Sequence, residues 1–201
     1  MRALVCIPAR DEVKTEFMMS LVGMMQHTVL NDEGINLEGI GFNVIRGTVL
    51  PSSRQSLAQQ AIDADVSHTL WIDTDMAFPK DTLSRLAKAG KDMIGINARS
   101  RRPPYPFLAE DTPTTRMVTD EKSTGIQKAH RIGFGLTLIK TDVFRMLDLP
   151  YFTFEWLEEK QSFRGEDYYF CEKARLAGVE FWVDHDLSKQ VGHIGDFAYM
   201  P

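Results

Sequence analysis

Two carboxylates follow a short apolar run near the middle of the chain. Residues 69–72 (Thr-Leu-Trp-Ile) predict a buried strand, and Asp73 and Asp75 come directly after it. In open α/β sheets, ligands bind in the crevice beyond the carboxyl ends of the strands. Carboxylate oxygens there suit a hard divalent cation, which often bridges substrate phosphates. The pattern favours a metal and phosphate site, and the simpler alternative is an acidic turn in which one Asp caps local structure.

A second acidic pair, Glu166 and Asp167, follows Gly165 and opens a predicted helix. Acidic residues in a first helical turn stabilise the helix dipole, so capping alone would explain both. A carboxylate at this point could instead serve as a general base that takes a proton from a hydroxyl group. The sequence leaves both interpretations open.

Two histidines near the C-terminus have different surroundings. His193 lies between Gly192 and Gly195, where the backbone can come close to a bound group, and imidazole can join carboxylates around a transition metal. A single histidine is more often structural. His185, between two aspartates, is expected in a solvated loop.

Several arginines stand where a crevice would need positive charge. Arg10 ends the first predicted strand after Pro8 and Ala9, and Arg54 opens the second predicted helix. Each guanidinium can pair with a surface acid or hold phosphate oxygens in the crevice. A later cluster predicts a solvated loop or a contact for an anionic acceptor: Arg99, Arg101 and Arg102.

The apolar pattern alternates between strands and helices. The predicted strands are 3–7, 40–45, 69–72, 93–96, 136–139 and 181–183, and the predicted helices are 15–26, 53–64, 80–89, 141–147 and 166–177. Residues 110–128 are polar and predict a loop or hairpin, and the chain should end in an irregular tail. This order predicts a single α/β domain with a mostly parallel sheet flanked by helices.

Composition narrows the class of protein further. The 201 residues are 43% hydrophobic and 25% charged, enough for one domain with a real core. No apolar run approaches the roughly 20 residues that span a bilayer, and the N-terminal run is too short for a signal peptide. Cys6 and Cys171 predict two reduced core thiols in a cytoplasmic protein. A net charge of −5 argues against general polyanion binding.

The order of these motifs matches a known family. Pro8-x-Arg10 comes first, then Arg54, then Leu-Trp-Ile-Asp-Thr-Asp at 70–75. The remaining motifs are Asp-Met-Ile-Gly at 92–95, Gly-Phe-Gly-Leu-Thr-Leu-Ile at 133–139, Gly-Glu-Asp at 165–167 and Gly-His at 192–193. Over nearly its whole length the chain resembles the GT-A class of nucleotide-sugar glycosyltransferases, in the small stand-alone form found in phages and bacteria.

The resemblance implies a set of site residues. Asp73 and Asp75 would hold Mn²⁺ or Mg²⁺ on the donor diphosphate, and His193 in the C-terminal segment would complete the metal site. Glu166 or Asp167 would act near the acceptor, one of them as the base in an inverting member. The nucleotide sugar would contact Pro8, Ala9, Arg10, Arg54, Asp73, Gly133, Phe134 and Gly135.

The sequence therefore predicts a metal-dependent glycosyltransferase for hexosyl or pentosyl transfer. Residues 1–98 would bind the nucleotide sugar, and residues 99–201 would form the acceptor side. A nucleotidyltransferase that makes activated sugars is the first alternative, but it would normally show a glycine-rich basic loop after the first strand. A non-catalytic sugar-nucleotide or glycan-binding module is the second. The acceptor stays open between a glycan, a protein, a lipid and modified DNA, and a phage-encoded enzyme would act in the host cytoplasm.

Overall fold

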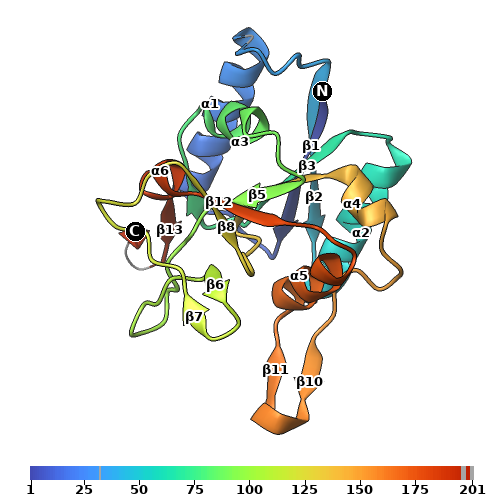
Figure 1. Cartoon of the computed structure of the whole chain (residues 1–201). Coiled ribbons are helices and arrows are strands. Elements are labelled where there is room, and N and C mark those ends of the chain that lie inside the picture. Colours follow the sequence, from blue (N-terminus) through green and yellow to red (C-terminus); the bar gives the residue numbers. More distant parts are fainter. Residues whose placement is uncertain (32, 196–197, 200–201) are drawn as a thin grey trace.

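A seven-stranded sheet forms the centre of the computed structural model, which describes residues 1–31, 33–195 and 198–199 (Figure 1). The strand order is β2-β1-β3-β9-β5-β12-β8. The strands are β1 Arg2–Ala9, β2 Gly39–Arg46, β3 His68–Ile72, β5 Met93–Gly95, β8 Ile126–Ala129, β9 Leu136–Lys140 and β12 Phe181–Asp184. Strands β8 and β9 run against the other five, so the sheet is mostly parallel, as predicted.

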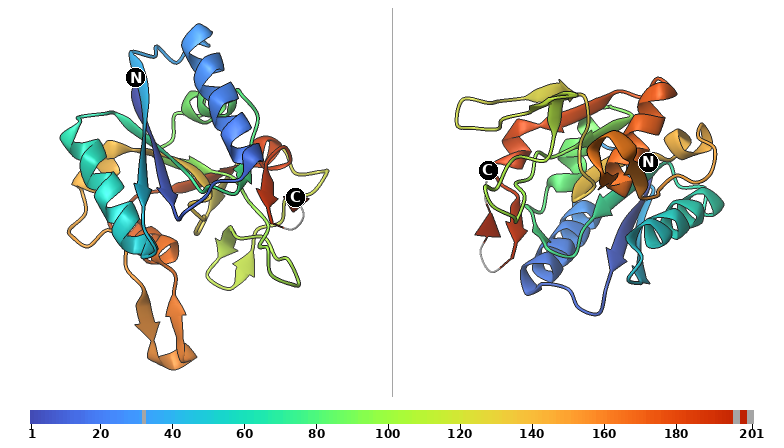
Figure 2. Two further views of the ribbon diagram at one scale, coloured as in Figure 1. Left: turned by 180° about the vertical axis from the view of Figure 1, so that it is seen from behind. Right: turned by 90° about the horizontal axis from the view of Figure 1, so that it is seen from below.

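Helices cover both faces of this sheet because the central strands are apolar on both sides. Along β1, Ala3, Val5 and Ile7 pack into one core cluster, and Leu4 and Cys6 pack into the other. The first cluster includes side chains of α1 (Thr15–Leu30) and α3 (Thr82–Lys88), and the second includes those of α2 (Leu50–Asp63), α4 (Thr141–Arg145) and α5 (Glu166–Leu176). Figure 2 shows α1 and α2 on opposite sides of β1 and β2. The predicted α/β layering is therefore confirmed.

The second half of the chain joins the same sheet. Strand β9 lies between β3 and β5 and is antiparallel to both. Between β5 and β8 the chain forms a small hairpin from β6 (Glu110–Thr112) and β7 (Thr115–Arg116), within the predicted excursion. A second hairpin, β10 (Glu155–Leu157) and β11 (Ser162–Arg164), was not predicted, and it projects from the body just before α5 (Figure 1). A 3-10 turn, η1 (Glu158–Lys160), closes it.

The C-terminal region is more regular than the predicted tail. After β12 come the short helix α6 (His185–Ser188), β13 (Gly192–Ile194) and β14 (Ala198–Tyr199). Strand β13 pairs antiparallel with β4 (Met76–Ala77). Strand β4 comes directly after Asp73 and Asp75, the two aspartates that follow β3. Residues 196, 197, 200 and 201 of the predicted metal-binding segment lie outside the described residues.

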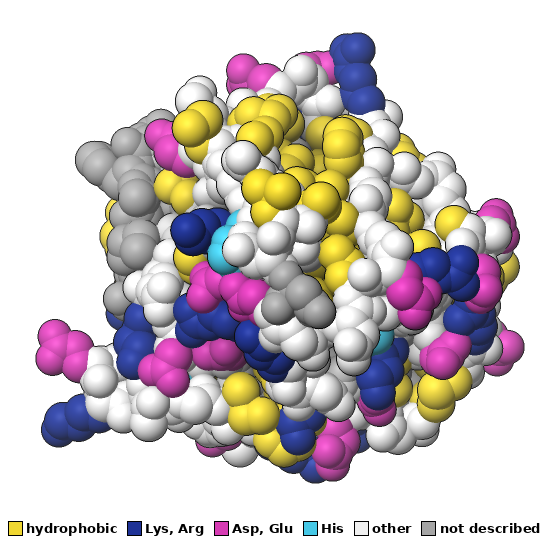
Figure 3. Space-filling model, turned by 90° about the horizontal axis from the view of Figure 1, so that it is seen from above, with side chains coloured by type: hydrophobic (Ala, Val, Ile, Leu, Met, Phe, Trp, Pro, Cys, Tyr) yellow, Lys and Arg dark blue, Asp and Glu magenta, His cyan; other side chains and the backbone are white. Residues whose placement is uncertain are grey.

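The outer surface of α1 keeps apolar side chains exposed: Met18, Met19, Val22, Val29 and Leu30. Seen from above, apolar side chains gather at this end of the molecule (Figure 3). Among the described residues, no helix combines the length and the apolar character that crossing a bilayer requires. Cys6 and Cys171 are free and buried, as predicted for core thiols.

Candidate active site

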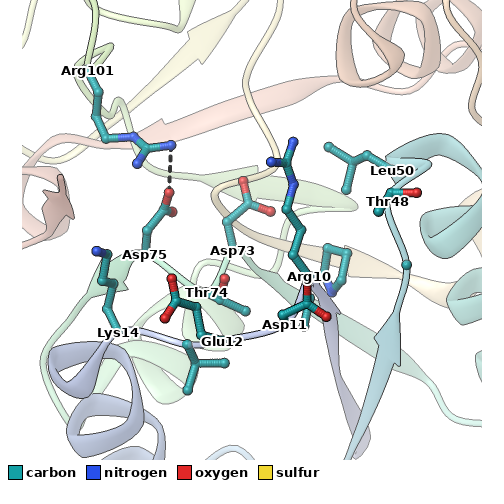
Figure 4. Close-up of a pocket in the computed structure, with 14 residues that line it drawn as sticks. Arg10, Asp11, Glu12, Lys14, Thr48, Leu50, Asp73, Thr74, Asp75 and Arg101 are labelled. Carbon is teal, nitrogen blue, oxygen red and sulfur yellow. Dashed lines mark ion pairs between the residues drawn. The ribbon is translucent and has the colours of Figure 1, made fainter.

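A pocket of about 500 Å³ lies where β1 and β3 end, and we call it the strand-end pocket. Its walls are the loop after β1, the turn after β2 and the turn after β3. A hydrogen bond from the Lys14 backbone N–H to the Thr74 carbonyl (3.1 Å) joins the loop after β1 to the turn after β3. Figure 4 shows the carboxylates of Asp73 and Asp75 and the guanidinium of Arg10 pointing to the same side. The lining residues are 8–14, Gly47, Thr48, Leu50, 73–75 and Arg101.

The pairing of β13 with β4 brings His193 to Asp75. His193 lies opposite Met76 in the ladder, and the backbone N–H of Ile194 donates to the carbonyl of Asp75 (2.6 Å). The His193 Nε2 is 3.5 Å from Asp75 Oδ1. This distance is too long for a strong hydrogen bond, so it is an electrostatic contact. The fold therefore brings together two residues that are far apart in the sequence, and a metal shared between them stays a prediction.

The hydrogen bonds of His193 fix its tautomer. Its Nδ1 lies 2.8 Å from the carbonyl oxygen of Arg99, which can only accept, so Nδ1 carries the hydrogen. The Nε2 lone pair of a neutral His193 then points toward Asp75. Burial alone would lower the pKa of His193, but the Asp75 carboxylate and the Arg99 carbonyl raise it overall. Without a competing cation, His193 is therefore biased toward the charged form.

Arg101 holds the other oxygen of Asp75. Its Nη2 is 2.9 Å from Asp75 Oδ2, and the pair is drawn as a dashed line in Figure 4. Burial alone would raise the pKa of Asp75, but His193 and Arg101 lower it overall, so the carboxylate is charged. The Arg101 side chain is 45% exposed, and its Nη1 also donates to the carbonyl of Ile194 (3.4 Å).

The residues around Asp75 fit a divalent cation in chemistry, although they are not arranged as a finished site. Asp75 Oδ1 is buried and has no hydrogen-bond partner among the described residues, which is costly unless another group approaches it. Carboxylate oxygens with one imidazole nitrogen form a donor set suited to Mn²⁺. Within the described residues, however, no three His, Cys, Asp or Glu side chains already converge as a metal cluster. The carboxylate that would bind the cation is paired with Arg101 instead.

A buried arginine, Arg54, connects the first acidic pair to the second. It is only 2% exposed, and its Nη2 lies 3.0 Å from Asp73 Oδ1 while its Nη1 lies 2.8 Å from Glu166 Oε1. The guanidinium also lies over the buried ring of Phe134, 5.0 Å from the centroid. The sequence folds this way because Arg54 occupies the inward stripe of α2, followed at helical spacing by Leu57, Ala58 and Ala61.

One guanidinium faces three carboxylates in this cluster. Burial raises the pKa of Asp73, of Glu166 and of Asp167 above the ordinary carboxyl range, although Arg54 lowers each of them. The same three acids raise the pKa of Arg54 against the effect of burial. A single positive charge cannot balance three negative ones, so a carboxylate here has more affinity for a proton than an exposed one.

Asp167 opens onto a different cavity, which we call the hairpin groove. This groove has a volume of about 700 Å³ and lies beside the β6–β7 and β10–β11 hairpins. The backbone N–H of Tyr168 donates to Asp167 Oδ1 (2.8 Å), which orients the carboxylate. Glu166 points to Arg54 instead, so the two adjacent acids serve different surroundings. The lining residues are Leu108, Glu110, Pro113, Arg116, His130, Arg131, Leu157, Lys160, 162–165, Asp167, Tyr168, Glu172 and Arg175.

The three predicted sugar-contacting residues lie between these cavities. The Gly135 carbonyl accepts from the Asp73 backbone N–H (3.0 Å), and a Cβ at Gly135 would lie 3.9 Å from Asp73 Oδ2. A Cβ at Gly133 would lie 3.7 Å from Asp167 Oδ2. Phe134 is buried in an aromatic cluster with Trp71, Phe152 and Phe170. Contact of these residues with a sugar stays a prediction.

Pro8, Ala9, Arg10, Asp73 and Asp75 all line the strand-end pocket, whereas Arg54 lies beneath it. The prediction for His185 was wrong. It is 2% exposed in α6 and its ring lies 2.8 Å from the Thr119 hydroxyl and 3.0 Å from the Gln127 amide oxygen, so it is a satisfied core residue.

Comparison with known proteins agrees with this architecture. No family model and no curated protein matches the sequence. Among solved structures, A197 from STIV matches with a TM-score of 0.68 and 16% identity, over 100% of this chain and 91% of A197. GalNAc-T7, crystallised with UDP, GalNAc and Mn²⁺, matches with a TM-score of 0.59 and 15% identity over 96% of this chain. The chain has a GT-A-like fold. It spans 43% of the GalNAc-T7 chain, and identities this low establish the fold alone.

Proposed function

We propose that this chain is a metal-dependent glycosyltransferase that moves a sugar from a nucleoside diphosphate to an acceptor hydroxyl. The observation that supports it best is the buried Oδ1 of Asp75 at the carboxyl end of β3, which accepts no hydrogen bond from the described residues and lies 3.5 Å from the Nε2 of His193. The GT-A-like fold and the pocket beside these residues agree with this proposal. Mn²⁺ or Mg²⁺ held by Asp75, Asp73 and His193 would stabilise the charge that grows on the departing diphosphate.

The chain's own residues divide the work between the two cavities. Pro8, Ala9 and Arg10 line the pocket in which the nucleotide would lie. Arg101 would leave Asp75 and offer its guanidinium to the phosphates, since it lines the same pocket. Such an exchange keeps a positive charge beside the diphosphate throughout.

Asp167 is the proposed general base for an inverting transfer. It lines the hairpin groove, and its raised pKa suits a group that must take a proton from a hydroxyl. Glu166 is held by Arg54, so it is the weaker candidate and acts as a positioning residue. In a retaining enzyme, Asp167 would instead stabilise positive charge on the sugar ring.

Two alternatives make different predictions. A nucleotidyltransferase would release pyrophosphate from a nucleoside triphosphate and a sugar phosphate. A binding module would hold a nucleotide sugar without hydrolysing it. Neither needs a carboxylate such as Asp167 facing a separate groove.

The test is a screen of nucleotide sugars for hydrolysis by the full chain, with Mn²⁺ and with EDTA. We expect one nucleotide sugar to be hydrolysed slowly with Mn²⁺ and not with EDTA. Pyrophosphate release from triphosphates, or binding of nucleotide sugars without any turnover, would contradict the proposal. The anomeric form of the released sugar, read by NMR, separates inversion from retention.

A further inference from the structure

We infer that the hairpin groove binds the acceptor, and that this acceptor is a sugar that carries a phosphate group. The inference rests on the proposed function, because it takes Asp167 as the base. Asp167 lines the groove and Asp73 lines the strand-end pocket. Arg54 touches Asp73 on one side and Glu166, the neighbour of Asp167, on the other. Two substrates in the two cavities would therefore meet at this cluster.

The charge of the groove selects the class of acceptor. Five cationic side chains line it against three acidic ones, in a chain whose net charge is −5. The cations are Arg116, Arg131, Lys160, Arg164 and Arg175, and the acids are Glu110, Asp167 and Glu172. A positively charged concave surface raises the local concentration of anions.

Ion pairs cancel part of this positive charge, since Arg175 pairs with Glu172 and Arg164 pairs with Glu155 outside the groove lining. Arg116 and Arg131 share a single carboxylate, that of Glu110, at 3.2 and 2.6 Å. Lys160, on the turn that closes the β10–β11 hairpin, is exposed and makes no ion pair with any described residue. Guanidinium groups bind phosphate oxygens in a forked geometry, and an ammonium adds a flexible point charge. Together these residues offer a phosphate site with spare positive charge.

An exposed aromatic ring stands at the same groove. Phe163 of β11 lines the groove and is 67% exposed, which is a high exposure for a large apolar side chain. It packs edge-on against Trp156 of β10, with 5.1 Å between the ring centroids, so its orientation is held. The free face of the ring can cover the C–H face of a sugar while the cations hold its phosphate. A ring and a cationic cluster side by side favour a phosphorylated sugar over a neutral sugar or a bare phosphate.

The test is calorimetric titration of the full chain with glucose 6-phosphate, glucose and inorganic phosphate as probes. We expect glucose 6-phosphate to bind at least about tenfold more tightly than either of the others. Lys160→Gln and Phe163→Ala should each weaken that binding about threefold to tenfold. The matched controls are Lys122→Gln and Phe154→Ala, which change an exposed lysine and an exposed ring outside the groove and should not alter it.

Equal binding of glucose and glucose 6-phosphate would overturn the inference, as would equal losses in the test and control variants. Failure of the proposed function has a different signature, because nucleotide-sugar hydrolysis is measured without any acceptor. A chain that binds glucose 6-phosphate in the groove but hydrolyses no nucleotide sugar would uphold the ligand class and refute glycosyl transfer. A chain that hydrolyses a nucleotide sugar but shows no preference for glucose 6-phosphate would support the proposed function and refute the phosphorylated acceptor.

Discussion

The strand-end pocket and the hairpin groove are formed by different kinds of structural element. The pocket rests on the ends of β1 and β3, and backbone hydrogen bonds fix its loops to each other, such as the one from the Lys14 N–H to the Thr74 carbonyl. The groove lies beside two short hairpins, one of which projects from the body (Figure 1). Rigid scaffolds commonly hold the chemistry while loops set specificity. Under the proposed function, the sheet would fix the donor chemistry and the hairpins would set the choice of acceptor.

The two cavities also differ in charge. Asp73 and Asp75 stand close together in the pocket, so that wall attracts a cation, whereas the groove has an excess of Arg and Lys. Arg54 lies between the two cavities, with Asp73 on one side and Glu166 on the other. Substitutions on each side of Arg54 should therefore separate metal binding from proton transfer.

The largest expected effect comes from Asp75. We expect Asp75→Ala to lose measurable Mn²⁺-dependent hydrolysis of the nucleotide sugar, because its carboxylate, with a buried Oδ1, is the proposed metal ligand. Binding of Mn²⁺, measured by electron paramagnetic resonance, should fall in parallel. Circular dichroism should show an unchanged fold.

Asp92→Ala is the control for that variant, because Asp92 is an exposed residue paired with Lys140 away from both cavities. Wild-type turnover in Asp75→Ala, with metal dependence intact, would refute the metal site. It would leave the acidic turn as the better interpretation of the two aspartates.

Asp167, which lies on the groove side of Arg54, should affect the rate of turnover. If Asp167 is the base, Asp167→Asn should lower turnover about 10²- to 10⁴-fold with little change in donor affinity. The amide oxygen can still accept the Tyr168 N–H, so the melting temperature should stay close to that of the wild type. A capping function predicts the opposite, a loss of about 0.5–2 kcal/mol in stability with nearly normal turnover.

The pH dependence sharpens this prediction. Burial raises the pKa of Asp167 in the folded protein. As the pH is lowered, the base should therefore become protonated, and turnover should fall, at a pH above the range in which an ordinary aspartate titrates. For stability the sign is reversed. A carboxyl whose folded pKa is raised favours folding below its unfolded pKa, and that contribution is lost as the pH rises through the folded value. Asp167→Asn should flatten both dependences.

Arg54 should affect stability more than any one of its partners. Arg54→Met keeps much of the volume but leaves Asp73 and Glu166 without their shared cation, and breaking a buried pair costs about 3–5 kcal/mol. Urea unfolding at neutral pH would measure this loss. The loss should shrink as the pH falls, because protonation removes the uncompensated charges.

Arg145→Met is the matched control, since Arg145 forms its ion pairs with Asp65 and Asp142 at the surface. We expect a change below about 1 kcal/mol there. Equal losses in the two variants would mean that the Arg54 cluster is no more than a set of ordinary surface pairs.

Much of the fold could be predicted because local apolar patterns report burial. The strands at 69–72 and 136–139 and the helix at 166–177 are close to β3, β9 and α5. The pattern could not show that β9 is antiparallel between β3 and β5, since strand direction is set by long-range pairing. The β10–β11 hairpin was missed because each of its strands has only three residues, too few to show the alternation of a half-buried strand.

The candidate site was predictable where it follows strand ends, as with Asp73 and Asp75. Arg54 had a signal in the sequence, because a cation at a position on the apolar stripe of a helix must find buried partners. His185 was misplaced because flanking aspartates suggest solvent, whereas its ring hydrogen-bonds to Thr119 and Gln127 in the interior. The ion pair of Arg101 with Asp75 could not be read from spacing, since it depends on how the proline-rich loop folds back.

The smallest expected effect comes from that ion pair, and it has the opposite sign to the others. Arg101→Gln frees Asp75 Oδ2, so Mn²⁺ should bind the protein alone more tightly. An exposed ion pair contributes up to about 1 kcal/mol, which corresponds to an increase in affinity of about twofold to fivefold. Nucleoside diphosphate should bind more weakly to the same variant, because the pocket loses a cation. Arg102→Gln, an exposed neighbour on the same loop, should change neither affinity. Weaker Mn²⁺ binding in Arg101→Gln would show that Arg101 supports the metal site and does not compete with the cation for Asp75. Tighter Mn²⁺ binding together with weaker diphosphate binding is the result expected if Arg101 exchanges Asp75 for the diphosphate.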